Sequence, residues 1–138
     1  MAKLSSFLID TRATADGAWI RVNEALYDDL EILTRGYTDE FVDAQAARQR
    51  KARMDLTLSE NDPLPNAVAR KLNASLLRDF LVLDVRNLTA DDGSAVTIEE
   101  FHAMLDQPEA QRLARACWDA SAKASVRTKE QADAALGN

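Results

Sequence analysis

The sequence predicts a mostly helical α+β fold, in which a short N-terminal antiparallel β-ribbon packs on a bundle of about four helices. Two observations predict it. Apolar side chains alternate with others over residues 17–22 and again over residues 26–36, a pattern typical of strands. Beyond these segments, apolar residues recur at helical spacing and expected helix starts carry capping residues. A lone ribbon is only marginally stable in water, so we expect it to lie on the helices.

The chain length fits one domain. Its 138 residues are enough for a core that needs no disulfide or metal, and the single Cys117 cannot form an internal bridge. We expect one domain over residues 1–120, followed by a frayed helical or disordered tail over residues 121–138. The tail is rich in alanine and polar residues and has little apolar face, so nothing in it would drive packing.

The predicted ribbon spans about residues 17–35. Its first strand is GAWIRV, and its second strand lies within LYDDLEILTRG, residues 26–36. In the second strand Leu30, Ile32 and Thr34 share one face, as alternation requires. We expect the loop between the strands to lie around Asn23 and Glu24.

The first helix of the predicted bundle covers about residues 38–56. It begins at Thr38, whose hydroxyl can accept a backbone N–H of the first turn. The segment has many charges and few apolar residues, so we expect an exposed helix. A linker with two prolines, residues 56–66, follows it.

The second helix of the bundle, about residues 65–85, is the expected core helix. Val68, Leu72, Leu76 and Phe80 recur every four residues, and further leucines widen the stripe. A helix that is apolar around much of its circumference is buried on several sides. We expect this one to be covered within the fold or partly by a partner.

The segment TADDGSAVTIEEF, residues 89–101, raises the question of calcium binding. With Gly93 at the sixth place of an EF-hand loop, Glu99 falls at the required twelfth place. Leu88 then occupies the first place, which needs an oxygen ligand. We therefore expect a turn at Gly93 rather than a calcium site.

The last two helices are expected over about residues 97–106 and 107–120. Thr97 and Glu100 form the capping-box pattern of the first one. For the second one, Asp106 is the expected cap, with Glu109 as its partner and Pro108 in the first turn.

Charge argues against nucleic acid as a partner. The net charge is −6, so attraction to phosphate is unfavourable overall. One basic cluster stands against this trend, formed by Arg48, Arg50, Lys51 and Arg53. A solvated helix face explains the cluster better than a phosphate-binding patch, because no aromatic residues are interleaved with it.

Motifs for catalysis or cofactor binding are missing from the sequence. His102 is the only histidine, and no second His or Cys lies at a metal-ligand spacing from it. Neither phosphate-loop pattern is present, and Cys117 is expected to be a small core residue. We expect no catalytic, cofactor or metal-binding residue, and hence no enzyme. No apolar run reaches the length of a membrane span, so we expect no membrane partner and a cytoplasmic location.

Three runs in order carry a resemblance to a known family. They are DGAWIRV, LEILTRGYTDEF and LNASLLRDFLVLDVRNLTADDGSAVTIEEFHAMLDQPEAQRLA. The chain resembles the tail assembly chaperones of long-tailed, siphovirus-type bacteriophages and their prophages. The matching residues are Gly17, Trp19, Asp84, Asn87, Leu88, Gly93, Thr97, Glu100 and Pro108. One departure is Val85, where the family pattern has a tryptophan after the aspartate.

The resemblance implies a protein without enzymatic activity that acts in the cytoplasm of the bacterial host. Such chaperones bind the long helical tape-measure protein, keep it soluble and help to recruit the major tail protein, which forms the tube. A further implied partner is a longer, frameshifted form of the same chain. Self-association into a homo-oligomer is left open by the apolar residues considered next.

A partner-binding surface can be proposed from the apolar residues. We expect contributions from Phe7 and Leu8 near the N-terminus and from the core helix. The core-helix residues are Leu76, Leu77, Phe80 and Leu81. The alternative is that all of them are internal core. Two other functions remain open: a head-tail adaptor or tail-completion protein retained in the virion, and a small helical nucleic-acid-binding regulator that uses the basic cluster.

Overall fold

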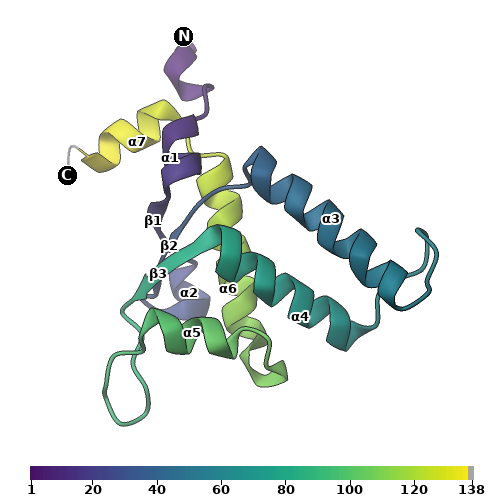
Figure 1. Ribbon diagram of the computed structural model, residues 1–138. Helices are drawn as coiled ribbons and strands as arrows, with labels where there is room; N and C mark the ends of the chain where they lie inside the picture. Colours follow the sequence, from purple (N-terminus) through teal and green to yellow (C-terminus); the bar gives the residue numbers. More distant parts are fainter. Residues whose placement is uncertain (137–138) are drawn as a thin grey trace.

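The computed structural model describes residues 1–136, which are mostly helical and include one small antiparallel sheet (Figure 1). The α-helices are α1 (Thr11–Asp16), α2 (Glu24–Tyr27), α3 (Asp39–Asp55), α4 (Asn66–Leu76), α5 (Ile98–Met104), α6 (Gln111–Ser125) and α7 (Lys129–Leu136). The strands are β1 (Ala18–Arg21), β2 (Glu31–Thr34) and β3 (Val82–Arg86). Short 3-10 turns, η1 (Leu4–Ser6) and η3 (Pro108–Ala110), and one π-helical turn, η2 (Leu77–Leu81), complete the chain.

The predicted antiparallel strand pair is present, but a third strand joins it. β1 pairs with β2, with Ile20 opposite Ile32. β3 pairs with the other side of β2 and places Val85 opposite Ile32, so the strand order is β1-β2-β3. The second strand is shorter than predicted because residues 24–27 form the helical turn α2, in which the Asn23 side chain accepts the backbone N–H of Ala25 at 3.0 Å.

The predicted helix over residues 65–85 is wrong at its C-terminal end. α4 stops at Leu76, η2 follows, and the chain is a strand from Val82. The segment FLVLDV, residues 80–85, is a short apolar run, which fits a buried strand as well as a helix. Backbone pairing with β2 decides between the two.

The core lies between the sheet and α6. The sheet turns Ile20, Ile32 and Val85 inward. α6 meets it with a stripe of small residues, among them Ala116, Cys117, Ala120, Ser121 and Ala124, which are fully buried. Small side chains let the helix approach the sheet closely. A buried hydroxyl pair, Thr34 Oγ1 and Ser121 Oγ at 2.7 Å, joins the two elements.

The C-terminal segment is more ordered than predicted. α6 continues to Ser125, five residues past the predicted domain boundary at 120, and α7 follows it. The start of α7 is tied to the N-terminal segment, because the Asp10 N–H donates to the Arg127 carbonyl at 2.9 Å and the Lys129 N–H donates to the Leu8 carbonyl at 3.0 Å. The N-terminal segment and α7 therefore lie beside one another (Figure 1). The last part of the predicted tail, residues 137–138, lies outside the described residues.

Two of the three predicted helix caps are confirmed. The Thr38 hydroxyl accepts the Phe41 N–H and the Thr97 hydroxyl accepts the Glu100 N–H, each at 3.2 Å. The predicted cap at Asp106 is wrong. Pro108 begins the turn η3 after Gln107, and α6 starts only beyond it. The Asp106 side chain instead accepts from Gln107 Nε2 at 3.2 Å.

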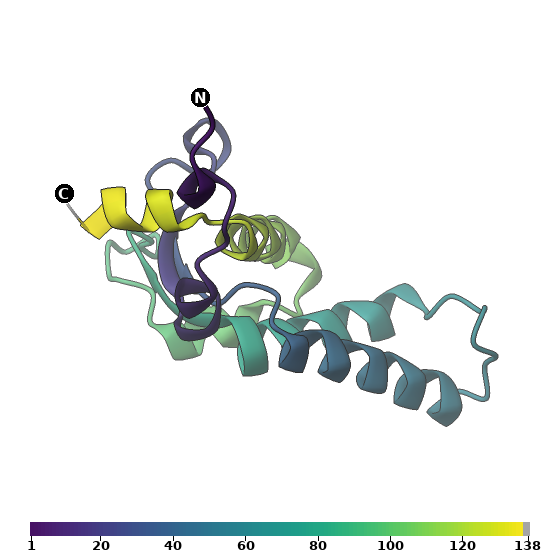
Figure 2. The same ribbon diagram turned by 90° about the horizontal axis from the view of Figure 1, so that it is seen from above.

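The helices α3 and α4 form a hairpin that projects away from the rest of the molecule (Figure 2). The far end of the hairpin, around residues 55–65, lies well away from the sheet in that view. Only its base is close to α6. No helix within residues 1–136 is both long and apolar enough to cross a membrane.

Candidate partner-binding groove

The structure separates the residues of the predicted partner-binding surface. Leu76, Leu77 and Leu81 are at most 1% exposed and belong to the core. In this fold Leu76 and Leu81 are covered by the core, while Leu77 lies at the floor of a surface hollow. Phe80 is half-buried beneath the Arg48 guanidinium, which lies 5.1 Å from its ring centroid. Phe7 is the one residue of the set with a largely exposed side chain, at 69%, and Leu8 beside it is partly exposed.

A different apolar surface lies at the base of the hairpin. Two adjoining hollows of about 320 and 390 Å³ share Asn73 of α4 and Trp118 of α6 as walls. We call the combined hollow the hairpin groove. Its full lining is Tyr37, Phe41, Val42, Gln45, Arg70, Asn73, Ala74, Leu77, Leu105, Gln111, Ala114, Arg115 and Trp118. The groove is thus formed mainly by α3, α4 and α6, with one wall from each.

Three aromatic rings form the centre of one half of the hairpin groove. Tyr37 stacks on Phe41 with ring centroids 5.3 Å apart, and Trp118 lies 6.0 Å from Phe41 and 6.3 Å from Tyr37. The Tyr37 hydroxyl donates to the Trp118 carbonyl at 3.3 Å. Burial, and then the nearby Asp119 carboxylate, raise the pKa of Tyr37, so the phenol stays neutral and keeps this hydrogen bond.

The chain entering α3 is fixed against α6, which positions the aromatic cluster. The Tyr37 N–H donates to Ser125 Oγ at 2.7 Å, and Ser125 in turn donates to the Ser121 carbonyl at 2.7 Å. Gly36 makes this approach possible, because a Cβ at its position would lie 2.8 Å from the Ser125 Cα. Aromatic pairs at this geometry are favourable beyond the area they bury.

The rim of the hairpin groove mixes apolar and cationic groups. Val42 is 50% exposed at one side. At the other side Arg70 donates to the Asp106 carbonyl at 3.0 Å, while the exposed Arg115 has no ion pair within residues 1–136. An apolar floor with cations at the rim suits an apolar segment that carries acidic side chains at its edge.

Three of the four cations in the basic cluster on α3 make polar contacts within the chain, and Arg48 joins the two halves of the hairpin. Arg48 donates to Ser75 Oγ at 2.8 Å and to the Asp79 carboxylate at 2.9 Å. Lys51 pairs with Asp55 and Arg53 donates to the Asp62 carbonyl, each at 3.0 Å. These contacts within the chain favour the structural interpretation of the cluster over a phosphate-binding patch.

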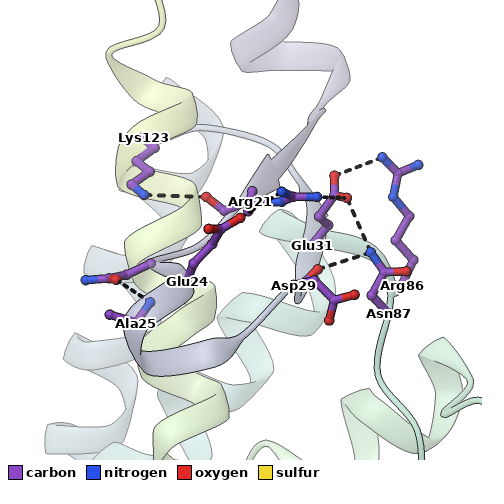
Figure 3. A network of polar contacts seen from close by, with 9 residues as sticks. Arg21, Glu24, Ala25, Asp29, Glu31, Arg86, Asn87 and Lys123 are labelled. Carbon is purple, nitrogen blue, oxygen red and sulfur yellow. Dashed lines mark hydrogen bonds and ion pairs between the residues drawn. The ribbon is translucent and has the colours of Figure 1, made fainter.

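A network of charged and polar side chains lies on the outer face of the sheet and includes Asn87, one of the residues that carry the resemblance (Figure 3). Glu31 of β2 lies between Arg86 at 2.8 Å and Arg21 at 3.5 Å. The hydrogen bond from Arg86 is the main cause that lowers the pKa of Glu31. Asn87 donates to the Asp29 carbonyl at 3.1 Å, and the Arg86 guanidinium lies 4.1 Å from the Trp19 ring centroid. The ion pairs of Glu31 therefore connect β2 to β1 through Arg21 and to β3 through Arg86.

The remaining motif residues also have local structural roles. Gly17 has a φ of 97° and its missing Cβ leaves room for Leu83. Asp84 accepts the N–H of Val85 at 2.8 Å. Gly93 has a φ of 88°, as the predicted turn requires. Leu88 packs against the core, and Pro108 starts η3.

His102 and Cys117, the residues considered for metal binding or catalysis, both have structural surroundings. His102 Nε2 lies 2.9 Å from the Val82 carbonyl at the sheet edge. Cys117 is fully buried, and burial raises the pKa of its thiol, which disfavours the reactive thiolate. Within residues 1–136, no three His, Cys, Asp or Glu side chains are grouped so as to hold a metal ion.

Sequence reasoning missed the hairpin groove. Tyr37 and Phe41 are four residues apart, so their rings can meet on one side of a helix. In the sequence alone, this segment indicated only the start of a helix. That Trp118 would complete the cluster depends on the packing of α6 beside α3. Spacing along the chain therefore indicated one pair of the cluster but not the groove as a whole.

Comparison with known proteins gave no relative. No family model matches the chain, and neither a curated protein nor a solved structure matches it.

Proposed function

We propose that the protein is a tail assembly chaperone that binds an amphipathic helical segment of a tape-measure protein in the hairpin groove. The observation that carries the proposal is the aromatic cluster of Tyr37, Phe41 and Trp118 in a groove walled by three helices. Helix-in-groove recognition uses an apolar floor of this kind. The resemblance in the order of sequence features supplies the class of client.

The rest of the fold provides a frame in this proposal. In it the ribbon of β1 and β2, extended by β3, would pack on a bundle of about four helices and hold α6 in place, and α6 in turn carries Trp118. The protein would act in the cytoplasm of the bacterial host, keep the tape-measure protein soluble and help to recruit the major tail protein. It would do so without catalysis, and beside a longer frameshifted form where one is made.

The client is tested by pull-down. The tagged protein is expressed with its neighbouring genes, and captured proteins are identified by mass spectrometry. We expect a very long, helix-rich partner, and we expect the protein to be absent from mature particles. Recovery of the protein within finished particles would instead identify a head-tail adaptor or tail-completion protein.

The groove is tested with two matched variants on the same helix. Val42→Glu places a carboxylate at the apolar rim of the groove, whereas Met54→Glu changes an exposed apolar residue at the far end of α3. Burying the new charge against a client should weaken capture on the order of tenfold or more. Met54→Glu should leave capture unchanged. Equal effects of the two variants would remove the groove from the proposal.

A further inference from the structure

One edge of the sheet has unpaired backbone groups. The Val22 N–H donates to the Leu30 carbonyl at 3.4 Å, which fixes the alternation of the β1–β2 ladder. By that alternation Ile20 bonds toward β2, while Trp19 and Arg21 direct their N–H and C=O groups away from the sheet. Among the hydrogen bonds of residues 1–136, only the one from Lys123 Nζ reaches this row, at 3.5 Å from the Arg21 carbonyl (Figure 3).

Two backbone groups at the opposite edge of the sheet are covered by side chains. On β3, the N–H of Val85 is accepted by the Asp84 carboxylate at 2.8 Å, and the carbonyl of Val82 lies 2.9 Å from His102 Nε2. Natural proteins cover free edges in this way because unpaired strand edges bind other strands. On β1 the only such contact from the described residues is the one from Lys123, so β1 is the more open of the two edges.

A hollow of about 380 Å³ lies beside β1. Its lining residues are Trp19, Ile20, Arg21, Lys123, Val126, Arg127 and Gln131. Val126, at the end of α6, is 64% exposed and gives an apolar contact point next to the edge. Lys123 and Arg127 have no ion pair within the described part of the chain and add positive charge.

We propose that the edge of β1 binds a short extended segment of another protein that carries acidic side chains. The segment would add a fourth strand through the Trp19 and Arg21 backbone groups, place an apolar side chain on Val126, and present carboxylates to Lys123 and Arg127. The positive charge of Lys123 and Arg127 favours an acidic segment over a second copy of this chain. A second copy of this chain would bring another set of the same cations to the edge, whereas an acidic strand neutralises them. This site is separate from the hairpin groove and does not depend on the function of that groove.

The probe is a short synthetic peptide in which valine alternates with glutamate, with blocked ends and a fluorescent label. Binding is measured by fluorescence polarisation, and the contact is located by NMR on the ¹⁵N-labelled full chain. We expect the amide signals of Trp19 and Arg21 to shift and to become protected from hydrogen exchange. The same peptide with N-methyl groups on alternate amides, or with lysine in place of glutamate, should not bind.

Charge reversal on the protein gives the matched comparison. The double variant Lys123→Glu with Arg127→Glu should weaken the glutamate peptide on the order of tenfold. The double variant Arg50→Glu with Lys51→Glu makes the same change in net charge on α3 and should have no effect. Equal binding of the lysine or N-methylated peptide would overturn the proposal. So would Trp19 and Arg21 amides already protected in a dimer of the free protein, because a second copy would then be the occupant.

Discussion

Gly36 offers the sharpest test of how the groove is held, through the substitution Gly36→Ala. A Cβ at this position would lie 2.8 Å from the Ser125 Cα, 2.9 Å from the Ser125 nitrogen and 2.8 Å from Thr14 Cγ2. Two of these atoms are backbone of α6, so the new methyl group cannot be accommodated by a side-chain rotation. Either α6 or the chain before α3 must move.

The expected cost combines overpacking with a lost hydrogen bond. Overpacking of a well-packed site costs about 1–3 kcal/mol. Movement of the chain would also break the bond from the Tyr37 N–H to Ser125 Oγ, now 2.7 Å, at about 1 kcal/mol. We expect the free energy of unfolding to fall by roughly 2–4 kcal/mol and Tm to fall by roughly 10 °C.

Urea denaturation followed by tryptophan fluorescence and far-UV circular dichroism measures this loss. Gly93→Ala is the comparison, because that position has no neighbour within 4 Å and its φ of 88° gives a strain cost alone, about 1 kcal/mol. A Gly36→Ala variant as stable as the wild type, or less affected than Gly93→Ala, would refute the close approach of residue 36 to α6.

Three further predictions follow from other parts of the fold. Thr97→Ala removes the cap of α5 and should lower the free energy of unfolding in urea by about 1 kcal/mol, whereas an unchanged midpoint would contradict the capping role. Arg86 holds the pKa of Glu31 in the folded protein below its ordinary value of 4.5. The ionised Glu31 carboxylate therefore stabilises the fold above pH 4.5, and this stabilisation is lost as the pH falls through the lower pKa of the folded protein. The free energy of unfolding of Glu31→Gln should therefore fall less steeply with decreasing pH than that of the wild type. An equally steep fall in the two proteins would contradict the role of this ion pair. Cys117 should react with a thiol reagent only after denaturation, because it is buried with a raised pKa. Fast modification of the native protein would contradict the packing of α6.

Local signals predicted the elements that depend on neighbouring residues. The turn at Gly93 and the caps at Thr38 and Thr97 are visible in a few letters, because a hydroxyl that accepts an N–H three residues ahead needs no distant partner. The alternation of Trp19, Ile20 and Arg21 likewise predicted a strand.

Contacts between distant segments decided the elements that the sequence left ambiguous. The apolar run before Arg86 is a strand because β2 offers a free edge on that side, and no spacing rule contains that fact. The alanines of the C-terminal half of α6 looked too small to drive packing, yet small residues are what a helix needs to lie close against a sheet. Their burial moved the end of the domain past residue 120.

The sequence by itself determined that the chain forms a mostly helical fold with an antiparallel ribbon, because hydrophobic period and capping are local properties. Only the tertiary structure decided which surfaces remain for partners. Packing buried Leu76, Leu77 and Leu81. It also brought Trp118 into contact with Tyr37 and Phe41, which lie roughly eighty residues earlier in the chain. The physical reason is that exposure belongs to the packed molecule: a side chain's accessibility depends on which distant element covers it, and its own neighbours in sequence carry little of that information.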